Sequence, residues 1–357
     1  MELSQFYKIK KGGNFSYPLI LMEDGMRKIG IIANPASGKD IRRLVAHATI
    51  VDNNEKVNIV KRIILASQEL GIEKIYIMAD TFNIGYKAAS NLAYLKQLKA
   101  DVEILDMPLT AGFKDSMVAA SMMEEKGVGC IVSLGGDGTN RAIAKVIKDT
   151  PLLPISTGTN NVYPSMIEGT VAGIAAAVVA SGLFDKAATC NKNKRIEIYK
   201  GRELVDIALI DAVISKESFI GAKAIWDPKS VTDIFVTRAH PASIGFSSIV
   251  GYKEIIDDGD DVGAHVQLGA EGETILAPIA PGVVREINIK KFNLLKLDED
   301  YIYNAENRGI IALDGEREIP VRAGDCILFR ISRNGPYQVD IRRTLEIAQK
   351  SNFFRKV

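Results

Sequence analysis

Short apolar runs alternate with helical patterns through the first half of the chain. The run KIGIIAN at 28–34 is rich in β-branched residues and ends at Asn34-Pro35, as a buried parallel strand does where it enters a loop. Between such runs, apolar residues recur three and four positions apart and predict helices. This alternation predicts a doubly wound, Rossmann-like α/β sheet. We expect strands at 28–34, 74–79, 102–105, 130–134 and 152–155, and helices at 56–70, 86–99, 113–126, 139–148 and 170–181.

The pattern changes near residue 189 to short alternating segments separated by Gly and Pro. Examples are 195–200, 283–289 and 326–331. Such segments are typical of antiparallel β structure, a sandwich or a barrel. We therefore predict an α/β nucleotide-binding domain over 1–185 and a β-sandwich domain over 186–340. A last helix, at about 342–350 within the segment 341–357, is expected to pack back on the first domain.

Composition narrows the function classes. The 357 residues suit two domains, and 45 Lys+Arg against 44 Asp+Glu leave a formal charge of +1. This balance argues against nucleic acid as a partner, because such binding requires clustered positive charge. Cys130, Cys190 and Cys326 are too few and too far apart for a disulfide framework or a zinc knuckle. With neither a signal peptide nor an apolar stretch of membrane-spanning length, we predict a cytoplasmic protein without a membrane partner.

The strongest chemical signal is the segment LGGDGTN at 134–140, between a predicted strand and a predicted helix. Its glycines allow positive φ and close approach of the backbone, and amides at a helix N-terminus bind anions. A loop that only holds phosphate gains little from Asp137. A loop that transfers phosphate needs a carboxylate to hold Mg²⁺ or to accept a proton. Taken alone, the motif fits a tight turn with Asp137 as a cap equally well.

Two further polar loops follow predicted strands. NPASGK at 34–39 is similar to a Walker A motif, but Ala33 stands where that motif needs Gly, and Asp40 where it needs Ser or Thr. A dinucleotide fingerprint is absent too, because Arg141 occupies the position of its third glycine. STGTNN at 156–161 offers hydroxyls and amides to a ribose, a phosphate or a substrate hydroxyl. Since ligands of doubly wound sheets bind beyond the carboxyl ends of the strands, the three loops predict one site.

Together the three motifs resemble the superfamily of NAD kinases, diacylglycerol kinases and sphingosine kinases. Within it they are similar to the ATP-NAD kinase-like branch typified by acetoin catabolism protein X. In the second half, APIAP at 277–281 resembles the TPICP-like segment of NAD kinases. DGE at 314–316, followed by Gly324-Asp325, resembles the DG(E/Q)…GD hairpins of the superfamily. The resemblance covers about 27–335 and implies a two-domain kinase that binds ATP between its domains.

The resemblance also implies roles for individual residues. Asp137 is the expected catalytic base or organiser of Mg²⁺, and Glu316 is a second catalytic candidate. Two departures concern the acceptor. Asn160-Asn161 stands where NAD kinases carry an Asn-Glu pair that holds the nicotinamide ribose, and PASIGFSS at 241–248 replaces a TPTGSTAY-like segment. Both argue against NAD as the phosphate acceptor.

We therefore predict an ATP- and Mg²⁺-dependent kinase that transfers the γ-phosphate to an alcohol group of a small polar metabolite. The alternatives are a genuine NAD kinase and a catalytically silent nucleotide-binding regulator. We also expect a homo-oligomer, either a dimer or a tetramer. The predicted nucleotide-binding residues are Asn34, Pro35, Ser37, Gly38, Lys39, Gly135, Gly136, Gly138 and Thr139; the predicted substrate residues are Thr157, Gly158, Thr159, Asn160, Asn161 and Ser243; and Asp137 is the predicted metal ligand.

Overall fold

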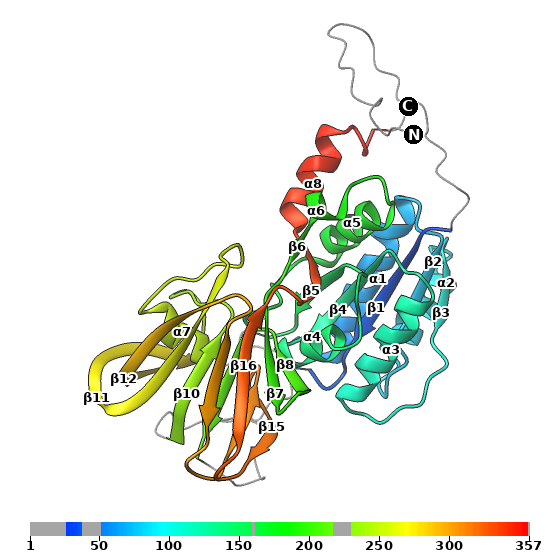
Figure 1. Ribbon diagram of the computed structural model, residues 1–357. Helices are drawn as coiled ribbons and strands as arrows, with labels where there is room; N and C mark the ends of the chain where they lie inside the picture. Colours follow the sequence, from blue (N-terminus) through cyan, green and yellow to red (C-terminus); the bar gives the residue numbers. More distant parts are fainter. Residues whose placement is uncertain (1–25, 38–50, 159–160, 217–229, 356–357) are drawn as a thin grey trace, which may run out of the picture.

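A parallel sheet with helices on both faces forms the first part of the chain (Figure 1). The computed structural model describes residues 26–37, 51–158, 161–216 and 230–355, without the side chains of 316–318. The sheet order is β3-β2-β1-β4-β5-β17-β6, and β1 to β5 are parallel. Because β1 lies between β2 and β4, the strand order reverses beside it. The predicted Rossmann-like α/β fold is confirmed.

Alternation along β1 explains the two helical layers. Ile29 and Ile31 face the core cluster built with α1 and α5, whereas Ile32 belongs to the cluster on the opposite face. All residues of β4 and β5 are buried, as expected for strands covered on both sides. The elements are β1 (Lys28–Ala33), α1 (Asn53–Glu69), β2 (Lys74–Ile77), α2 (Ile84–Tyr94), β3 (Asp101–Ile104), α3 (Phe113–Glu125), β4 (Cys130–Gly135), α4 (Asp137–Ala144), β5 (Leu152–Ser156), α5 (Gly169–Ala180), α6 (Lys186–Thr189) and β6 (Cys190–Lys192).

Two helices differ in length from the sequence prediction. The helix expected at 86–99 spans Ile84–Tyr94, because Lys96 has a φ of 56° and ends the helical path. The helix expected at 139–148 begins earlier, at Asp137, and ends at Ala144. Asp137 therefore lies in the first turn of α4.

The second part is an antiparallel sandwich of two sheets, as predicted. A six-stranded sheet, β12-β11-β10-β9-β14-β15, packs on a four-stranded sheet, β13-β16-β7-β8. Phe235 and Phe329 stack between the sheets with their ring centroids 4.0 Å apart. The elements are β7 (Arg195–Lys200), β8 (Glu203–Ala208), β9 (Asp211–Ser215), β10 (Val231–Val236), α7 (Phe246–Gly251), β11 (Val262–Ala280), β12 (Val283–Lys296), β13 (Asp300–Asn304), β14 (Gly309–Leu313), β15 (Glu316–Val321), β16 (Cys326–Ser332), β17 (Tyr337–Val339) and α8 (Ile341–Lys350).

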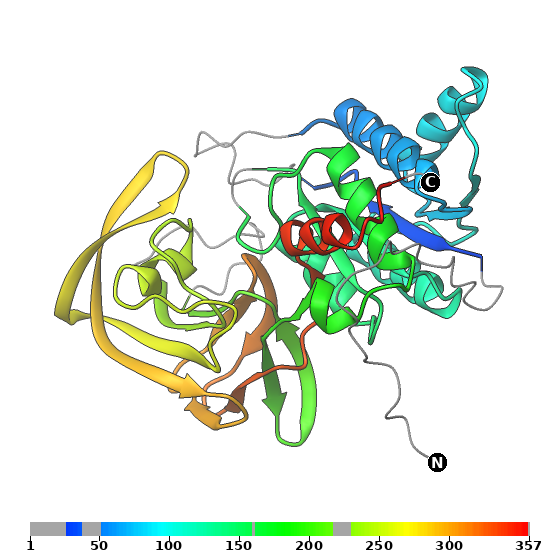
Figure 2. The same cartoon turned by 90° about the horizontal axis from the view of Figure 1, so that it is seen from above.

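The hairpin of β11 and β12 is much longer than the short strands expected from the sequence. Its strands have 19 and 14 residues, and it projects away from the α/β part (Figures 1 and 2). The strand expected at 283–289 is only the first half of β12. Register shifts near Leu268 and Pro278 interrupt the pairing of the two strands.

Two segments assigned to the β domain by sequence instead pair with the parallel sheet. β17 lies parallel to β5, with Gln338 opposite Leu152, and β6 runs antiparallel to β17. α8 then packs on α5 and α6 (Figure 2), and Thr344 Oγ1 donates to Thr189 O at 3.0 Å. The chain thus crosses between the α/β part and the β sandwich twice, after β6 and before β17. Strands of three residues are too short for their hydrophobic period to reveal these crossings. The limits 1–185, 186–340 and 341–357 otherwise stay a prediction.

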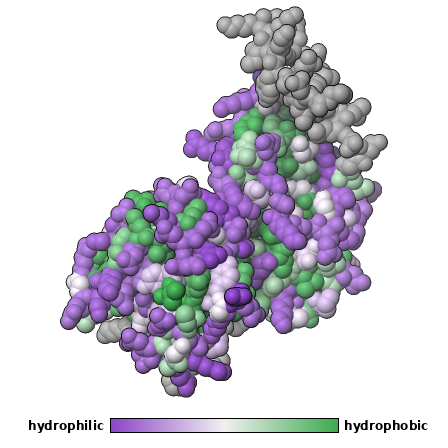
Figure 3. Space-filling model, in the orientation of Figure 1, coloured by the Kyte–Doolittle hydropathy of each residue, from purple (hydrophilic) through white to green (hydrophobic). Residues whose placement is uncertain are grey.

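The surface in Figure 3 is mostly hydrophilic, with small apolar patches over both parts. Within the described ranges, no helix is long and apolar enough to cross a membrane. The three cysteines are free. Cys130 and Cys190 are buried, whereas Cys326 is exposed.

Candidate functional site

The three polar loops begin side by side at one edge of the parallel sheet. Ala33 pairs with Leu134, and Gly135 pairs with Ser156, so β1, β4 and β5 end at the same level. The amide of Asn34 donates to Leu134 O at 3.0 Å, which extends the pairing into the first loop. This arrangement matches the expectation that ligands bind beyond the carboxyl ends of the strands.

Hydrogen bonds between side chains connect the first loop to the other two. Asn34 Nδ2 donates to Thr139 Oγ1 at 2.9 Å, and Thr157 Oγ1 donates to Ser37 Oγ at 3.0 Å. Asn34 Oδ1 also accepts from the amide of Ala36 at 2.9 Å, which closes an Asx turn. The structure thus brings together four residues singled out by sequence: Asn34, Ser37, Thr139 and Thr157.

Lys56 on α1 organises the first loop, and sequence reasoning missed it. Its side chain is 0% exposed, and its Nζ donates to Asn34 O at 2.8 Å, Ser37 O at 2.9 Å and Asn53 Oδ1 at 3.1 Å. A buried ammonium group is stable only with such a set of acceptors. The available signal was a lysine on the apolar face of a helix, in register with Val60 and Ile63.

The glycines of the second loop are required for space and not for backbone conformation. The sequence analysis allowed for positive φ, but none of Gly135, Gly136 and Gly138 has it. A Cβ on Gly135 would lie 2.5 Å from Thr139 Cβ, and one on Gly136 would lie 2.7 Å from Asn161 Oδ1. Close approach to the first turn of α4 and to the third loop therefore requires these glycines.

The carboxylate of Asp137 links the second loop to the chain that follows the third. Asp137 Oδ1 accepts from the amide of Tyr163 at 2.8 Å, and both carboxylate oxygens lie 3.1 Å from the amide of Val162. Amide donors of this kind stabilise the charged form of a carboxylate. Asp137 is half-buried, and its bonds to these two amides give it a structural role that is independent of any catalytic role.

The side-chain amide of Asn161 makes hydrogen bonds to the second and third loops. Its Oδ1 accepts from the amide of Asp137 at 3.4 Å, and its Nδ2 donates to Ser156 Oγ at 2.8 Å and Gly158 O at 3.3 Å. Gly38, Lys39, Thr159 and Asn160 lie outside the described residues.

Ser243 is not brought to the loops. It lies in the turn before α7, where its amide donates to His240 O at 2.9 Å. Within the described part of the chain, no hydrogen bond joins Ser243 to the three loops.

The β domain reaches the site through Asp314, which sequence reasoning treated only as part of the DGE motif. Asp314 and Gly315 both have positive φ, 49° and 81°, as a two-residue hairpin turn between β14 and β15 requires. The Asp314 carboxylate is buried and accepts from the amides of Leu209, Ile210 and Asp211 at 2.7–3.2 Å. Glu316 follows in β15, but its side chain is not described.

Arg141 connects this turn to the helix of the glycine loop. Arg141 is on α4, is 3% exposed, and its Nε lies 3.7 Å from Asp314 Oδ2. Its Nη1 lies 3.4 Å from Asp206 Oδ1, which Lys145, the C-cap residue of α4, approaches to 2.7 Å. Burial raises the pKa of Asp314, while Arg141 and the three amides oppose this shift. These ion pairs fix α4 against the DGE turn.

A cavity of about 180 Å³ adjoins the first loop. Asn34, Pro35 and Ala36 form one wall, and residues from the loops after β2 and β3 form the others. Among these, Asp80 caps α2 by accepting from the amides of Phe82 and Ile84, both at 2.8 Å. Sequence reasoning did not single out this part of the site, although it too lies beyond the carboxyl ends of parallel strands.

The residues present fit Mg²⁺ only as an ion held mainly by phosphates. Within the described ranges, no group of three or more His, Cys, Asp or Glu side chains could hold a metal. Mg²⁺ commonly binds through one or two carboxylates plus substrate phosphates, so a single Asp137 beside the three loops satisfies that pattern.

Comparison with known proteins agrees with this architecture. Residues 29–184 match the family model of the ATP-NAD kinase N-terminal domain, and residues 194–334 match that of the acetoin catabolism protein X C-terminal domain. The fold and its loops thus define a member of the NAD kinase superfamily, which confirms the resemblance seen in the sequence.

The chain belongs more narrowly to the acetoin catabolism protein X family. It is 36% identical over 339 residues to acetoin catabolism protein X of Cupriavidus necator. The match covers 92% of this chain and 94% of that protein.

Proposed function

We propose that the chain is an ATP-dependent kinase that transfers the γ-phosphate to an alcohol group of a small polar metabolite. The main support is the joining of three loops into one site by the bonds Asn34–Thr139, Thr157–Ser37 and Asp137–Val162. Such a loop set at the N-terminus of α4 suits phosphate, because helix N-termini and exposed amides attract anions.

The nucleoside end of ATP is proposed to enter the 180 Å³ cavity beside the first loop. This cavity is smaller than the roughly 300–1,000 Å³ of complete small-molecule sites, so it suits one part of a nucleotide. Its wall of Asn34, Pro35 and Ala36 continues directly into the loop that would hold phosphate. Calorimetry with ATP and with inorganic tripolyphosphate tests this assignment. Equal affinity for both would contradict it.

Asp137 is proposed to act on the phosphoryl group and its acceptor. Its amide bonds favour the charged carboxylate, which suits a ligand of Mg²⁺ or an acceptor for the proton of the attacking hydroxyl. Mg²⁺, where bound, neutralises negative charge on the phosphates. The three loops and α4 then orient the phosphates relative to Asp137.

A smaller acceptor is preferred over NAD because Asn161 is already engaged. Both ends of its amide bond within the loops, so it is not free to receive a ribose diol. A site that leaves a buried polar group unpaired loses about 1–3 kcal/mol, or roughly 5- to 150-fold in affinity. NADP⁺ formation with kcat/KM of about 10⁴ M⁻¹s⁻¹ or more would instead identify a genuine NAD kinase.

The decisive experiment measures ATP binding and phosphate transfer on the same samples. A panel of small polyols and hydroxyketones, with NAD beside them, serves as acceptors. Asp137→Asn should lower turnover by on the order of 10²–10⁴-fold while the protein still binds ATP. Asp149→Asn is the matched control, because Asp149 is an exposed carboxylate of the same domain.

Two results would contradict the proposal. Full turnover in Asp137→Asn would leave the carboxylate only its structural link. ATP binding without transfer to any acceptor would favour the nucleotide-binding regulator.

We also propose a homo-oligomer, either a dimer or a tetramer. Its support is the exposed apolar residues of the projecting hairpin, where Leu276, Val284 and Leu294 are 52–60% exposed. Light scattering after size exclusion tests it, and a monomer at all concentrations would contradict it.

A further inference from the structure

A second cavity in the described part of the chain lies in the β domain and not at the three loops. Its volume is about 620 Å³, within the range of small-molecule sites. It opens between the two sheets of the sandwich, with walls from β9, β10, β11 and β12 on one side and β13 on the other. It shares no residue with the loops or with the 180 Å³ cavity.

Strand β9 separates this cavity from the domain interface. At one end of the strand, the amide of Asp211 donates to Asp314 at 3.2 Å, beside Arg141. At the other end, Ser215 lines the cavity. Five residues of strand span on the order of 13 Å, so the cavity is a separate site and not an extension of the loops.

The deepest charged group in the cavity is Asp233, which is only 3% exposed. Its Oδ1 lies 2.8 Å from His265 Nε2, and His265 Nδ1 lies 3.3 Å from Asn293 Nδ2. The imidazole therefore occupies Oδ1 of the carboxylate. Within the described residues, Oδ2 of Asp233 has no hydrogen-bond partner. A buried carboxylate oxygen without a donor is costly, so the cavity floor favours a ligand group that donates there, such as an ammonium.

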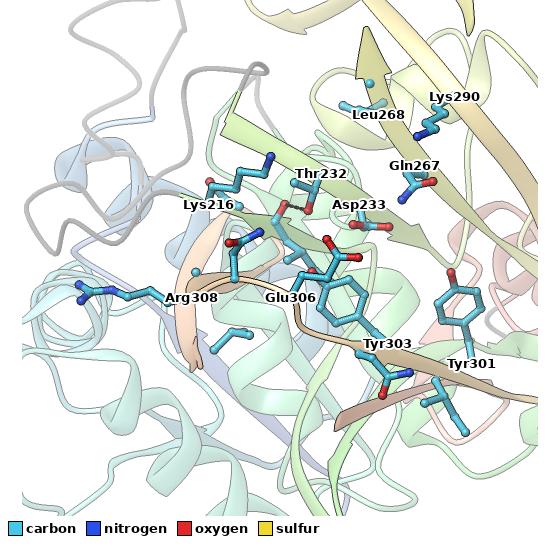
Figure 4. A pocket seen from close by; sticks show the side chains of 18 of the residues that line it. Lys216, Thr232, Asp233, Gln267, Leu268, Lys290, Tyr301, Tyr303, Glu306 and Arg308 are labelled. Atoms are coloured by element: carbon cyan, nitrogen blue, oxygen red, sulfur yellow. Dashed lines mark hydrogen bonds between the residues drawn. The ribbon is translucent and has the colours of Figure 1, made fainter. Parts of the chain in front are cut away.

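Three neighbouring side chains extend this preference for a cation. Figure 4 shows Asp233 and Glu306 pointing into the middle of the cavity, with Tyr301 and Tyr303 around them. Burial raises the pKa of both tyrosines, and the negative charge of Asp233 adds to the shift, so their hydroxyls stay protonated. Tyrosine rings attract ammonium groups through their faces, and the two carboxylates supply acceptors.

The rim of the cavity carries positive charge, in contrast to the acidic floor. Lys216 stands at the end of β9 and Lys290 on β12, both exposed and both lining the cavity (Figure 4). Neither ammonium group has a hydrogen bond or ion pair with another described residue. A ligand whose cationic end reaches Asp233 would therefore meet positive charge where it leaves the cavity.

We propose that this cavity binds a small zwitterion. Its ammonium group lies between Asp233 and Glu306, and its anionic group, a carboxylate or a phosphate, lies at Lys216 and Lys290. The inference concerns binding alone and does not depend on the proposed kinase activity. Its test uses the full chain without ATP and without turnover, so its failure and that of the kinase proposal are distinguishable.

The first experiment compares four probes by calorimetry and saturation-transfer NMR. 4-Aminobutyrate carries both charges, whereas butylamine and butyrate each carry one. Phosphoethanolamine replaces the carboxylate by a phosphate and identifies which anion the rim prefers. At least one zwitterion should bind about tenfold more tightly than either singly charged probe, because it gains one more charged hydrogen-bond partner. Absence of binding, or equal affinity for butylamine and the zwitterions, would overturn the proposal.

Adjacent lysines on β12 provide a matched pair of variants. Lys290 lines the cavity, whereas Lys291 is also exposed but does not line it. Lys290→Gln should weaken binding of the zwitterion by about tenfold, and Lys291→Gln should leave it unchanged. Equal effects of the two variants would overturn the assignment. Glu306→Gln, at an exposed residue, tests the proposed ammonium position. It should weaken the binding of butylamine and of the zwitterions alike, and an unchanged affinity for butylamine would overturn the assignment of the ammonium group to Glu306.

Discussion

Replacing Lys56 tests whether one buried ammonium group holds the first loop in its binding shape. Lys56→Met keeps the length and the apolar stem but removes the donors to Asn34 O, Ser37 O and Asn53 Oδ1. Asn34 O keeps a donor, Ser37 Oγ at 2.7 Å, so two acceptors lose their described partner.

The magnitude follows from these two acceptors. Each unpaired acceptor costs about 1–3 kcal/mol, and removing a buried charge returns part of this cost, so we expect a net loss of about 2–4 kcal/mol. For a domain of this size, the loss lowers Tm by about 4–16 °C. The loop would also lose its preformed shape, so ATP affinity should fall by about tenfold or more, as it does when a binding-competent state is less populated.

The assay combines thermal unfolding with ATP calorimetry. Lys61→Met is the matched control, because Lys61 is on the same helix, is only half-buried and makes no described hydrogen bond. The reasoning is refuted if Lys56→Met and Lys61→Met have the same Tm and the same ATP affinity. A lower Tm with unchanged ATP affinity would separate the stability of α1 from the loop and remove the role of Lys56 in binding.

Three further predictions concern packing, the domain interface and pH. Gly135→Ala should cost about 1–3 kcal/mol and weaken ATP binding because its Cβ meets Thr139, whereas Gly259→Ala, with nothing within 4 Å, should match wild type by calorimetry. Arg141→Gln should lower the free energy of unfolding by about 3 kcal/mol because it leaves the buried carboxylate of Asp314 without its cation, whereas Asp206 keeps Lys145; a shift near zero in urea unfolding would contradict this. Burial lowers the pKa of Lys194 from 10.5 to about 8, so the cost of its charge is full below pH 8 and disappears toward pH 10.5. Wild type should therefore gain stability over Lys194→Met across that window, and parallel pH profiles would contradict it.

Much of the architecture was predictable from local pattern. Strands buried on both faces carry continuous apolar runs, which is why β1, β4 and β5 were recognised within about a residue of their ends. The position of the candidate site was predictable too, because polar loops follow each of these strands and parallel strands end at one edge. The motifs at 34–39, 134–140 and 156–161 also sufficed to indicate the superfamily.

Tertiary structure decided what depends on contacts between distant segments. The short strand β17 joins the parallel sheet by pairing with β5, and β6 joins it by pairing with β17. Strands of three residues are too short for their hydrophobic period to reveal this. Lys56 and Arg141 look like ordinary helix residues in the sequence. Their roles arise because folding buries their charges beside loops 19 to 173 positions away. Asp137 and Asn161 were singled out by residue type, but only the fold revealed that their polar atoms bond within the loops. Residue type and spacing determine which chemistry is available, whereas the packing of separate segments determines which polar atoms are already paired.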